Sequence, residues 1–147
     1  MMKVIFVCTG NTCRSPMAEK IFNKKAKETS LDVAAISRGV ACSDGLPMNV
    51  SARAVMKEEG LDFEHRSRMI SEEDMNTASY VITVTSSHKR YLEEAFGRRG
   101  NVFSIEEITG GEGVFDPYGA DVDVYRRCYK ILEKAIGDVI EKLFSKR

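Results

Sequence analysis

Two residues near the start of the chain, Cys8 and Arg14, have the types and the spacing for chemistry on a phosphoryl group. Both lie in the segment CTGNTCRS, which covers residues 8–15. A thiolate is a nucleophile, and the planar guanidinium of arginine binds two oxygens of a phosphate. The pair therefore predicts phosphoryl transfer through a cysteinyl-phosphate, with Cys8 as the nucleophile and Arg14 as the phosphate-binding residue.

This segment lies between a predicted strand and a predicted helix. Residues 4–7 are β-branched or aromatic, as in a buried strand, and Pro16 is typical of a first helical position. The first N–H groups of a helix have no intrahelical partner, and the helix dipole adds positive charge, so the loop favours an anion. We expect its N–H groups to line a bowl, with Cys8 at the base, Arg14 at the rim and Gly10 supplying unusual backbone angles.

Length and composition predict an ordinary cytoplasmic domain. The 147 residues, taken as one domain over 1–147, can bury a core, and 22 basic residues balance 22 acidic ones. This balance of charge indicates neither nucleic acid nor a membrane as a partner. We expect a monomer. The cysteines at 8, 13, 42 and 128 lack the paired spacing of a zinc site, so neither a metal nor a cofactor is expected.

Alternating strands and helices along the chain predict a three-layer α/β domain around a parallel sheet. Strands are expected at 4–7, 33–36, 80–84 and 101–104. Helices are expected at 16–28, from 49 or 51 to about 60, over a short segment opening at 71, at 87–96, and from 121 onwards. The glycine-rich segment 108–120 is expected to be a loop. Ligands of such sheets bind at the carboxyl ends of strands, where the Cys8 loop lies.

Asp116, which precedes Pro117 in the glycine-rich segment, is the candidate general acid. Displacing a phosphoryl group from an ester or a phosphoramidate requires a proton for the leaving atom, and a carboxylic acid on a loop is a common donor. Asp-Pro alone is mostly a turn signature, so this assignment depends on the presence of the Cys8 loop.

The string CTGNTCRSPMAE, residues 8–19, resembles the active-site loop of the low-molecular-weight protein tyrosine phosphatases, as does its place after the first strand. The resemblance implies a flavodoxin-like fold with a four-stranded parallel sheet in the order 2-1-3-4 and an N-terminal phosphate-binding loop. It also implies that Asp116 is the general acid and later helps water to attack the cysteinyl-phosphate. The expected substrates are phosphorylated proteins.

Most of the expected substrate-binding residues belong to this loop. They are Thr9, Gly10, Asn11, Thr12, Cys13, Arg14, Ser15 and Tyr118. Ser15 either hydrogen-bonds the nucleophilic thiolate and helps it leave, or caps the helix, and both roles are compatible. Asn11 can adopt left-handed backbone angles and is expected to hold the bowl through its amide. The resemblance implies that Ser37 and His65 brace this asparagine.

Cys13 has two interpretations. The resemblance suggests that it traps an oxidised Cys8 as a reversible disulfide before the sulfinic acid forms, and the short separation permits this. It is equally compatible with a small buried apolar side chain. Cys42 and Cys128 are expected to be inert.

Thr12 bears on which phosphorylated side chain is the substrate. Tyrosine-directed members of the family usually have an aliphatic residue here, whereas threonine resembles the bacterial protein arginine phosphatases. A hydroxyl suits a guanidinium better than an aromatic ring. Tyr118-Gly119, and the segment TSSH at 85–88, also depart from the tyrosine-directed pattern, although Tyr118 can flank either substrate and no role is assigned to His88. Phosphoarginine is favoured, with phosphotyrosine as the alternative.

Two proteins of other classes could carry a similar loop. Thioredoxin-coupled arsenate reductases share the fold and relay oxidation to further cysteines, but residues 80–100 contain none. A non-catalytic phosphate-binding module would need neither Cys8 nor Asp116, and the chain has both.

Overall fold

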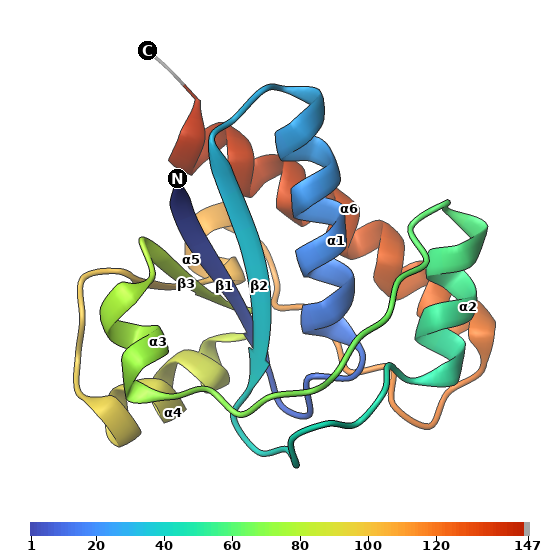
Figure 1. Cartoon of the computed structure of the whole chain (residues 1–147), viewed down its shortest axis with the longest axis horizontal. Helices are drawn as coiled ribbons and strands as arrows, with labels where there is room; N and C mark the ends of the chain where they lie inside the picture. Colours follow the sequence, from blue (N-terminus) through green and yellow to red (C-terminus); the bar gives the residue numbers. More distant parts are fainter. Residues whose placement is uncertain (146–147) are drawn as a thin grey trace.

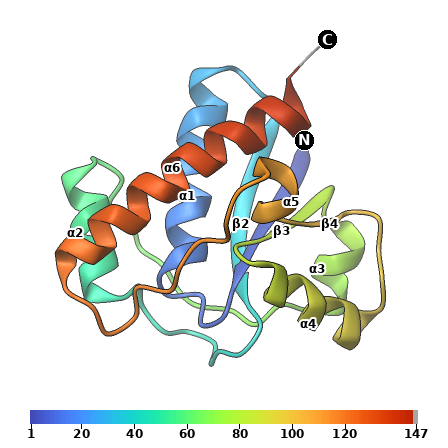
Figure 2. The ribbon, with the colours of Figure 1, turned by 180° about the vertical axis from the view of Figure 1, so that it is seen from behind.

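The computed structural model describes residues 1–145, in which four parallel strands form one sheet, so the last two residues of the predicted 1–147 domain lie outside the described part. The strands are β1 (Met2–Cys8), β2 (Val33–Gly39), β3 (Tyr80–Thr83) and β4 (Val102–Ser104). Their order, β2-β1-β3-β4, confirms the predicted topology (Figures 1 and 2). Since β1 pairs with both β2 and β3, its carboxyl end lies in the middle of the sheet edge.

Helices cover both faces of the sheet, as predicted. They are α1 (Arg14–Glu28), α2 (Val50–Glu58), α3 (Glu72–Thr77), α4 (Ser86–Phe96), α5 (Ile105–Thr109) and α6 (Val122–Phe144). The long α6 packs against α1, α2 and α5 on one face, while α3 and α4 lie on the other (Figures 1 and 2). None of the helices in residues 1–145 is long and apolar enough to cross a bilayer.

The alternation of side chains along β1 explains the two cores. Val4 and Phe6 belong to the cluster under α1 and α6, whereas Ile5 and Val7 belong to the cluster under α3 and α4. All four side chains are fully buried, which is why this strand reads as a continuous apolar run. β1 is thus a rigid central support for the loop that follows Cys8.

The predicted starts of α2 and α3 are confirmed, and one helix was missed. Asn49, rather than Ser51, caps α2, and Ser71 forms a capping box with Asp74. The prediction that 108–120 is entirely loop is wrong at its start, because α5 extends to Thr109. Ser104 opens that short helix with a capping box of its own.

Candidate active site

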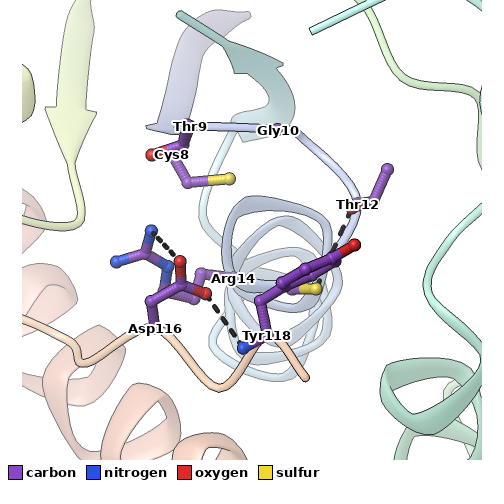
Figure 3. A pocket seen from close by; sticks show the side chains of 8 residues that line it. Cys8, Thr9, Gly10, Thr12, Arg14, Asp116 and Tyr118 are labelled. Carbon is purple, nitrogen blue, oxygen red and sulfur yellow. Dashed lines mark hydrogen bonds and ion pairs between the residues drawn. The ribbon is translucent and has the colours of Figure 1, made fainter. Parts of the chain in front are cut away.

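A pocket of about 250 Å³ opens where β1 ends (Figure 3). Its lining residues come from the Cys8 loop and from the glycine-rich segment: Cys8, Thr9, Gly10, Thr12, Cys13, Arg14, Asp116 and Tyr118. The structure therefore brings the predicted nucleophile, phosphate-binding residue and general acid to one cavity. The other predicted residues, Asn11, Ser15, Ser37 and His65, are not among its lining residues and instead form a network of hydrogen bonds around the loop.

Cys8 is the last residue of β1, and its side chain faces Ser15 in the first turn of α1. Its Sγ lies 2.9 Å from Ser15 Oγ, and Cys8 is only 2% exposed. Ser15 is fully buried, and its Oγ lies 3.3 Å from the carbonyl oxygen of Arg38. The serine hydroxyl, which donates to that carbonyl oxygen, has one hydrogen and can turn it to a thiolate at Cys8 over the shorter contact.

Asn11, rather than Gly10, supplies the unusual backbone angle of the loop. Its φ is 55°, whereas Gly10 is not among the glycines with positive φ, so the prediction for Gly10 is wrong. Asparagine tolerates this conformation because its side chain replaces lost backbone hydrogen bonds. Asn11 Nδ2 donates to Ser15 Oγ at 2.8 Å, and Asn11 Oδ1 accepts from the backbone N–H of Arg68 at 2.8 Å.

The structure places Ser37 and His65 against Asn11. Ser37 Oγ accepts from Asn11 Nδ2 at 3.0 Å and donates to Glu19 Oε1 at 2.8 Å. His65 Nε2 lies 2.6 Å from the carbonyl oxygen of Asn11, so this nitrogen carries the proton and donates. Burial lowers the pKa of His65, which favours the neutral ring. These contacts fix both the amide and the backbone of Asn11.

Arg14 is the first residue of α1, and it is 5% exposed. Cys13, which precedes it, makes no side-chain cap, so the first-turn N–H groups of α1 are left without a capping side chain. Arg14 Nη1 donates to the carbonyl oxygen of Val114 at 2.9 Å, which holds the guanidinium at the pocket. A fixed cation and an uncapped helix N-terminus together favour a bound anion.

Asp116 reaches the same pocket from the segment between α5 and α6. Its Oδ2 lies 3.7 Å from Arg14 Nη2, and its side chain is 56% exposed. Asp116 Oδ1 accepts from the backbone N–H of Tyr118 at 3.1 Å, in a local turn. Tyr118 is 77% exposed, and its ring lies at the mouth of the pocket in Figure 3. A ligand bound at Arg14 would therefore meet a carboxyl group on its outer side.

Cys13 lies in the loop with its side chain directed at α6. Its Sγ is 3.6 Å from Tyr125 Oη, and burial raises the pKa of the Cys13 thiol. All four cysteines are free thiols. The disulfide between Cys8 and Cys13 stays a prediction.

Gly39, which pairs with Cys8 in the sheet register, supports the loop from below. A Cβ at this position would lie 2.7 Å from the carbonyl oxygen of Thr9 and 3.0 Å from Asn11 Cβ. No side chain fits there without moving the loop. The close approach lets the backbone N–H of Ala41 donate to the Thr9 carbonyl oxygen at 3.0 Å.

His88, to which the sequence assigned no role, also contacts the loop. It lies in the first turn of α4, is 7% exposed, and its Nε2 lies 2.8 Å from Thr9 Oγ1. Its Nδ1 lies 2.6 Å from Oγ1 of Thr85, the N-cap residue of α4. Burial, helped by the charge of Arg14, lowers the pKa of His88 to about 4. The imidazole is therefore neutral at pH 7.

This neutral histidine predicts an acid sensitivity of the fold. Because the pKa of His88 is about 4 in the folded chain against an ordinary value of 6.5 for histidine, the unfolded chain binds more protons between these pH values. The free energy of unfolding should therefore fall as the pH falls from 6.5 to 4, by up to roughly 3 kcal/mol from this residue. Denaturant unfolding at pH 7 and pH 4 measures this, with His88→Gln as the control that lacks the loss. Equal losses in both proteins would contradict the prediction.

No cluster of three or more His, Cys, Asp and Glu residues within 1–145 is arranged to hold a metal ion.

Comparison with known proteins agrees with this geometry. The family model described as low molecular weight phosphotyrosine protein phosphatase matches residues 3–147. The chain belongs to this family. Family members similar to it include the protein-arginine-phosphatase of Bacillus subtilis, 38% identical over 99% of this chain and 99% of that protein. PtpB of Staphylococcus haemolyticus, a low molecular weight protein-tyrosine-phosphatase, is 36% identical over 92% of this chain and 96% of that protein.

Solved structures of the low molecular weight phosphatase family have the same fold. The low molecular weight protein tyrosine phosphatase from T. tengcongensis superposes with a TM-score of 0.92 at 44% identity, covering 97% of this chain and 100% of that one. A cysteine-to-serine mutant of the YwlE arginine phosphatase, with a phosphorylated active-site serine, superposes with a TM-score of 0.94 at 36% identity, covering 99% and 98%.

Proposed function

We propose that this chain is a protein phosphatase that hydrolyses phosphoarginine through a cysteinyl-phosphate. The observation that carries the proposal is the convergence in one pocket of the Cys8 thiol, the uncapped start of α1, the buried Arg14 guanidinium and the Asp116 carboxyl group. Each part has a task in phosphoryl transfer. A module that only binds phosphate would need neither the thiol nor the carboxyl group.

In the first step, the Cys8 thiolate attacks phosphorus while the backbone N–H groups of the loop and Arg14 bind the phosphoryl oxygens. The bond between phosphorus and the guanidinium nitrogen breaks, and Asp116 gives its proton to that nitrogen. The exposed position of Asp116, outside the guanidinium of Arg14, is where the leaving group of a bound substrate would lie.

In the second step, the Asp116 carboxylate takes a proton from water, whose oxygen attacks phosphorus, and the S–P bond breaks. The Ser15 hydroxyl, 2.9 Å from Cys8 Sγ, then donates to the returning thiolate. The phosphorylated active-site serine of the YwlE mutant supports a side-chain-bound phosphoryl group in a relative at 36% identity.

The preference for phosphoarginine rests on Thr12. Its side chain is partly exposed and lines the pocket with Tyr118. A hydroxyl at this position can accept a hydrogen bond from a guanidinium N–H, which an aliphatic side chain cannot do. The 38% identity with the protein-arginine-phosphatase of B. subtilis supports the same choice. Phosphotyrosine is the second candidate, because the exposed Tyr118 ring could pack against an aromatic substrate.

The experiment that tests the proposal compares kcat/KM for a phosphoarginine peptide and a phosphotyrosine peptide of matched sequence, with the Cys8→Ser protein as the blank. We expect a ratio above about ten in favour of phosphoarginine, equal to about 1.4 kcal/mol of transition-state preference. The reverse ratio would indicate a tyrosine phosphatase. Turnover of neither peptide, with phosphate still bound, would indicate a binding module, and thiol oxidation that depends on arsenate would indicate a reductase.

Replacing Thr12 by isoleucine tests the residue behind this preference. The phosphoarginine to phosphotyrosine ratio of kcat/KM should fall by about tenfold, because the hydroxyl partner of the guanidinium is lost and an apolar surface for the ring is gained. Thr12→Ser is the matched control, since it keeps the hydroxyl and should keep most of the preference. An unchanged ratio in Thr12→Ile would remove Thr12 from the specificity argument.

A further inference from the structure

One pair of side chains at the pocket, Thr9 and His88, has no task in the mechanism above. The two residues come from segments 79 positions apart, and their contact joins the start of α4 to the residue that follows the nucleophile. His88 is 7% exposed and lies between Thr9 Oγ1 at 2.8 Å and Thr85 Oγ1 at 2.6 Å. A histidine held on both ring nitrogens has a fixed orientation.

The role of Thr85 as the N-cap of α4 indicates the direction of the hydrogen bonds. A neutral imidazole donates from one nitrogen and accepts at the other. Thr85 Oγ1 already accepts from the backbone N–H of His88 and can accept from Ser87 Oγ, so its own hydrogen is available for Nδ1, which lies 2.6 Å away. With Nδ1 as the acceptor, the proton of the ring is on Nε2, which donates to Thr9 Oγ1.

This direction determines what the Thr9 hydroxyl can do. Its oxygen accepts from His88, so its own hydrogen is free, and within residues 1–145 no other side chain is hydrogen-bonded to Thr9 Oγ1. Thr9 follows Cys8 directly and lines the pocket, where both lie above Arg14 and Asp116 in Figure 3. In a pocket that favours an anion, a free O–H points its hydrogen at that anion.

We propose that the Thr9 hydroxyl donates a hydrogen bond to the bound phosphoryl group, and that His88, oriented by Thr85, is the positioning residue that turns this hydroxyl toward the pocket. The inference rests on the proposed function for the identity of the anion as a phosphoryl group. Inorganic phosphate is the probe, because it contains the same oxygens and requires no turnover.

The tautomer of His88 gives a test that is independent of activity. The imidazole ¹⁵N spectrum at pH 7, assigned with the His88→Gln protein, should show the His88 proton on Nε2. A proton on Nδ1 would reverse both hydrogen bonds, direct the Thr9 hydroxyl at His88 instead of at the pocket, and overturn the proposal.

Two amide substitutions separate the two contacts of His88. The amide of His88→Asn reaches about as far as Nδ1 and can keep the contact with Thr85, whereas that of His88→Gln reaches about as far as Nε2 and can keep the contact with Thr9. We expect the Kd for inorganic phosphate to rise roughly tenfold in His88→Asn and in Thr9→Val. In His88→Gln, the Kd should return most of the way to the wild-type value. The double variant Thr9→Val with His88→Asn should be no weaker than Thr9→Val alone.

Controls distinguish this proposal from a merely structural role and from the proposed function. Tyr91→Phe changes an exposed side chain of α4 and should leave phosphate binding unchanged. The proposal would be overturned if His88→Asn bound phosphate as tightly as the wild type, or if His88→Gln did not recover phosphate affinity. If His88→Asn does not fold, normal phosphate affinity in Thr9→Val would overturn the proposal. If the phosphate affinities follow the expected pattern but no phosphorylated peptide is hydrolysed, this inference holds and the proposed phosphatase activity is wrong.

Discussion

Replacing Cys8 by serine is expected to lower kcat for phosphorylated peptides below about 0.1% of the wild-type value. The Cys8 side chain lies at the base of the pocket, 2.9 Å from a buried serine and beside the uncapped start of α1, so its thiolate is the group that faces a bound phosphorus. A serine hydroxyl at the same place is a far weaker nucleophile, since its proton has no base to accept it. Steady-state kinetics on a phosphoarginine peptide measures the loss.

The same protein should still bind phosphate, because Arg14 and the N–H groups of α1 are unchanged by the substitution. Cys42→Ser is the matched control, as Cys42 is a free thiol outside the pocket lining and its loss should leave kcat near the wild-type value. Residual activity of Cys8→Ser above a few per cent would show that another group attacks phosphorus.

Asp116→Asn should slow substrates with poor leaving groups by about 10² to 10³ and activated aryl phosphates by much less. An asparagine keeps the shape of the side chain and can still accept the N–H of Tyr118, but it has no acidic proton to transfer. A phosphoarginine or phosphotyrosine peptide needs that proton, whereas a nitrophenolate leaves without it. The measurement is kcat/KM for a series of phosphates whose leaving groups differ in pKa.

Glu112→Gln is the control for Asp116→Asn, because Glu112 is an exposed carboxylate of the same segment that does not line the pocket. It should leave the whole series unchanged. If Asp116→Asn slowed good and poor leaving groups equally, its carboxyl group would be acting on binding or on the shape of the loop.

Much of the fold could be predicted from local patterns in the sequence. The continuous apolar run of β1 and the alternation of helices with strands were sufficient for a parallel sheet covered on both faces. The helix α5 was missed because its five residues are too few for a helical period and glycines follow closely. The signal that could have found it was Ser104 with Glu107, which has the form of a capping box.

The residues of the pocket could also be predicted from the sequence. Cys8 and Arg14 share one loop, and the presence of that loop made Asp116 the candidate general acid. His88 was not found, because its role depends on a contact between the start of α4 and Thr9 that no local pattern encodes. For the backbone of the loop, the expectation that Asn11 can adopt left-handed angles is confirmed, and only the expectation for Gly10 is wrong. The left-handed position belongs to Asn11, whose side chain finds partners in Ser15 and in the distant Arg68.

The contact of Arg14 with the carbonyl oxygen of Val114 joins residues 100 positions apart, and it has a consequence for folding. Closing so long a segment is entropically costly, so such contacts form after the local β1 and α1 elements. Recovery of phosphate binding during refolding therefore reports the final assembly of the chain and not the return of its helices. Phosphate at a hundred times its Kd would stabilise only the completed state, by about 2.7 kcal/mol. A partly folded chain carries every one of these residues and is expected to bind no phosphate.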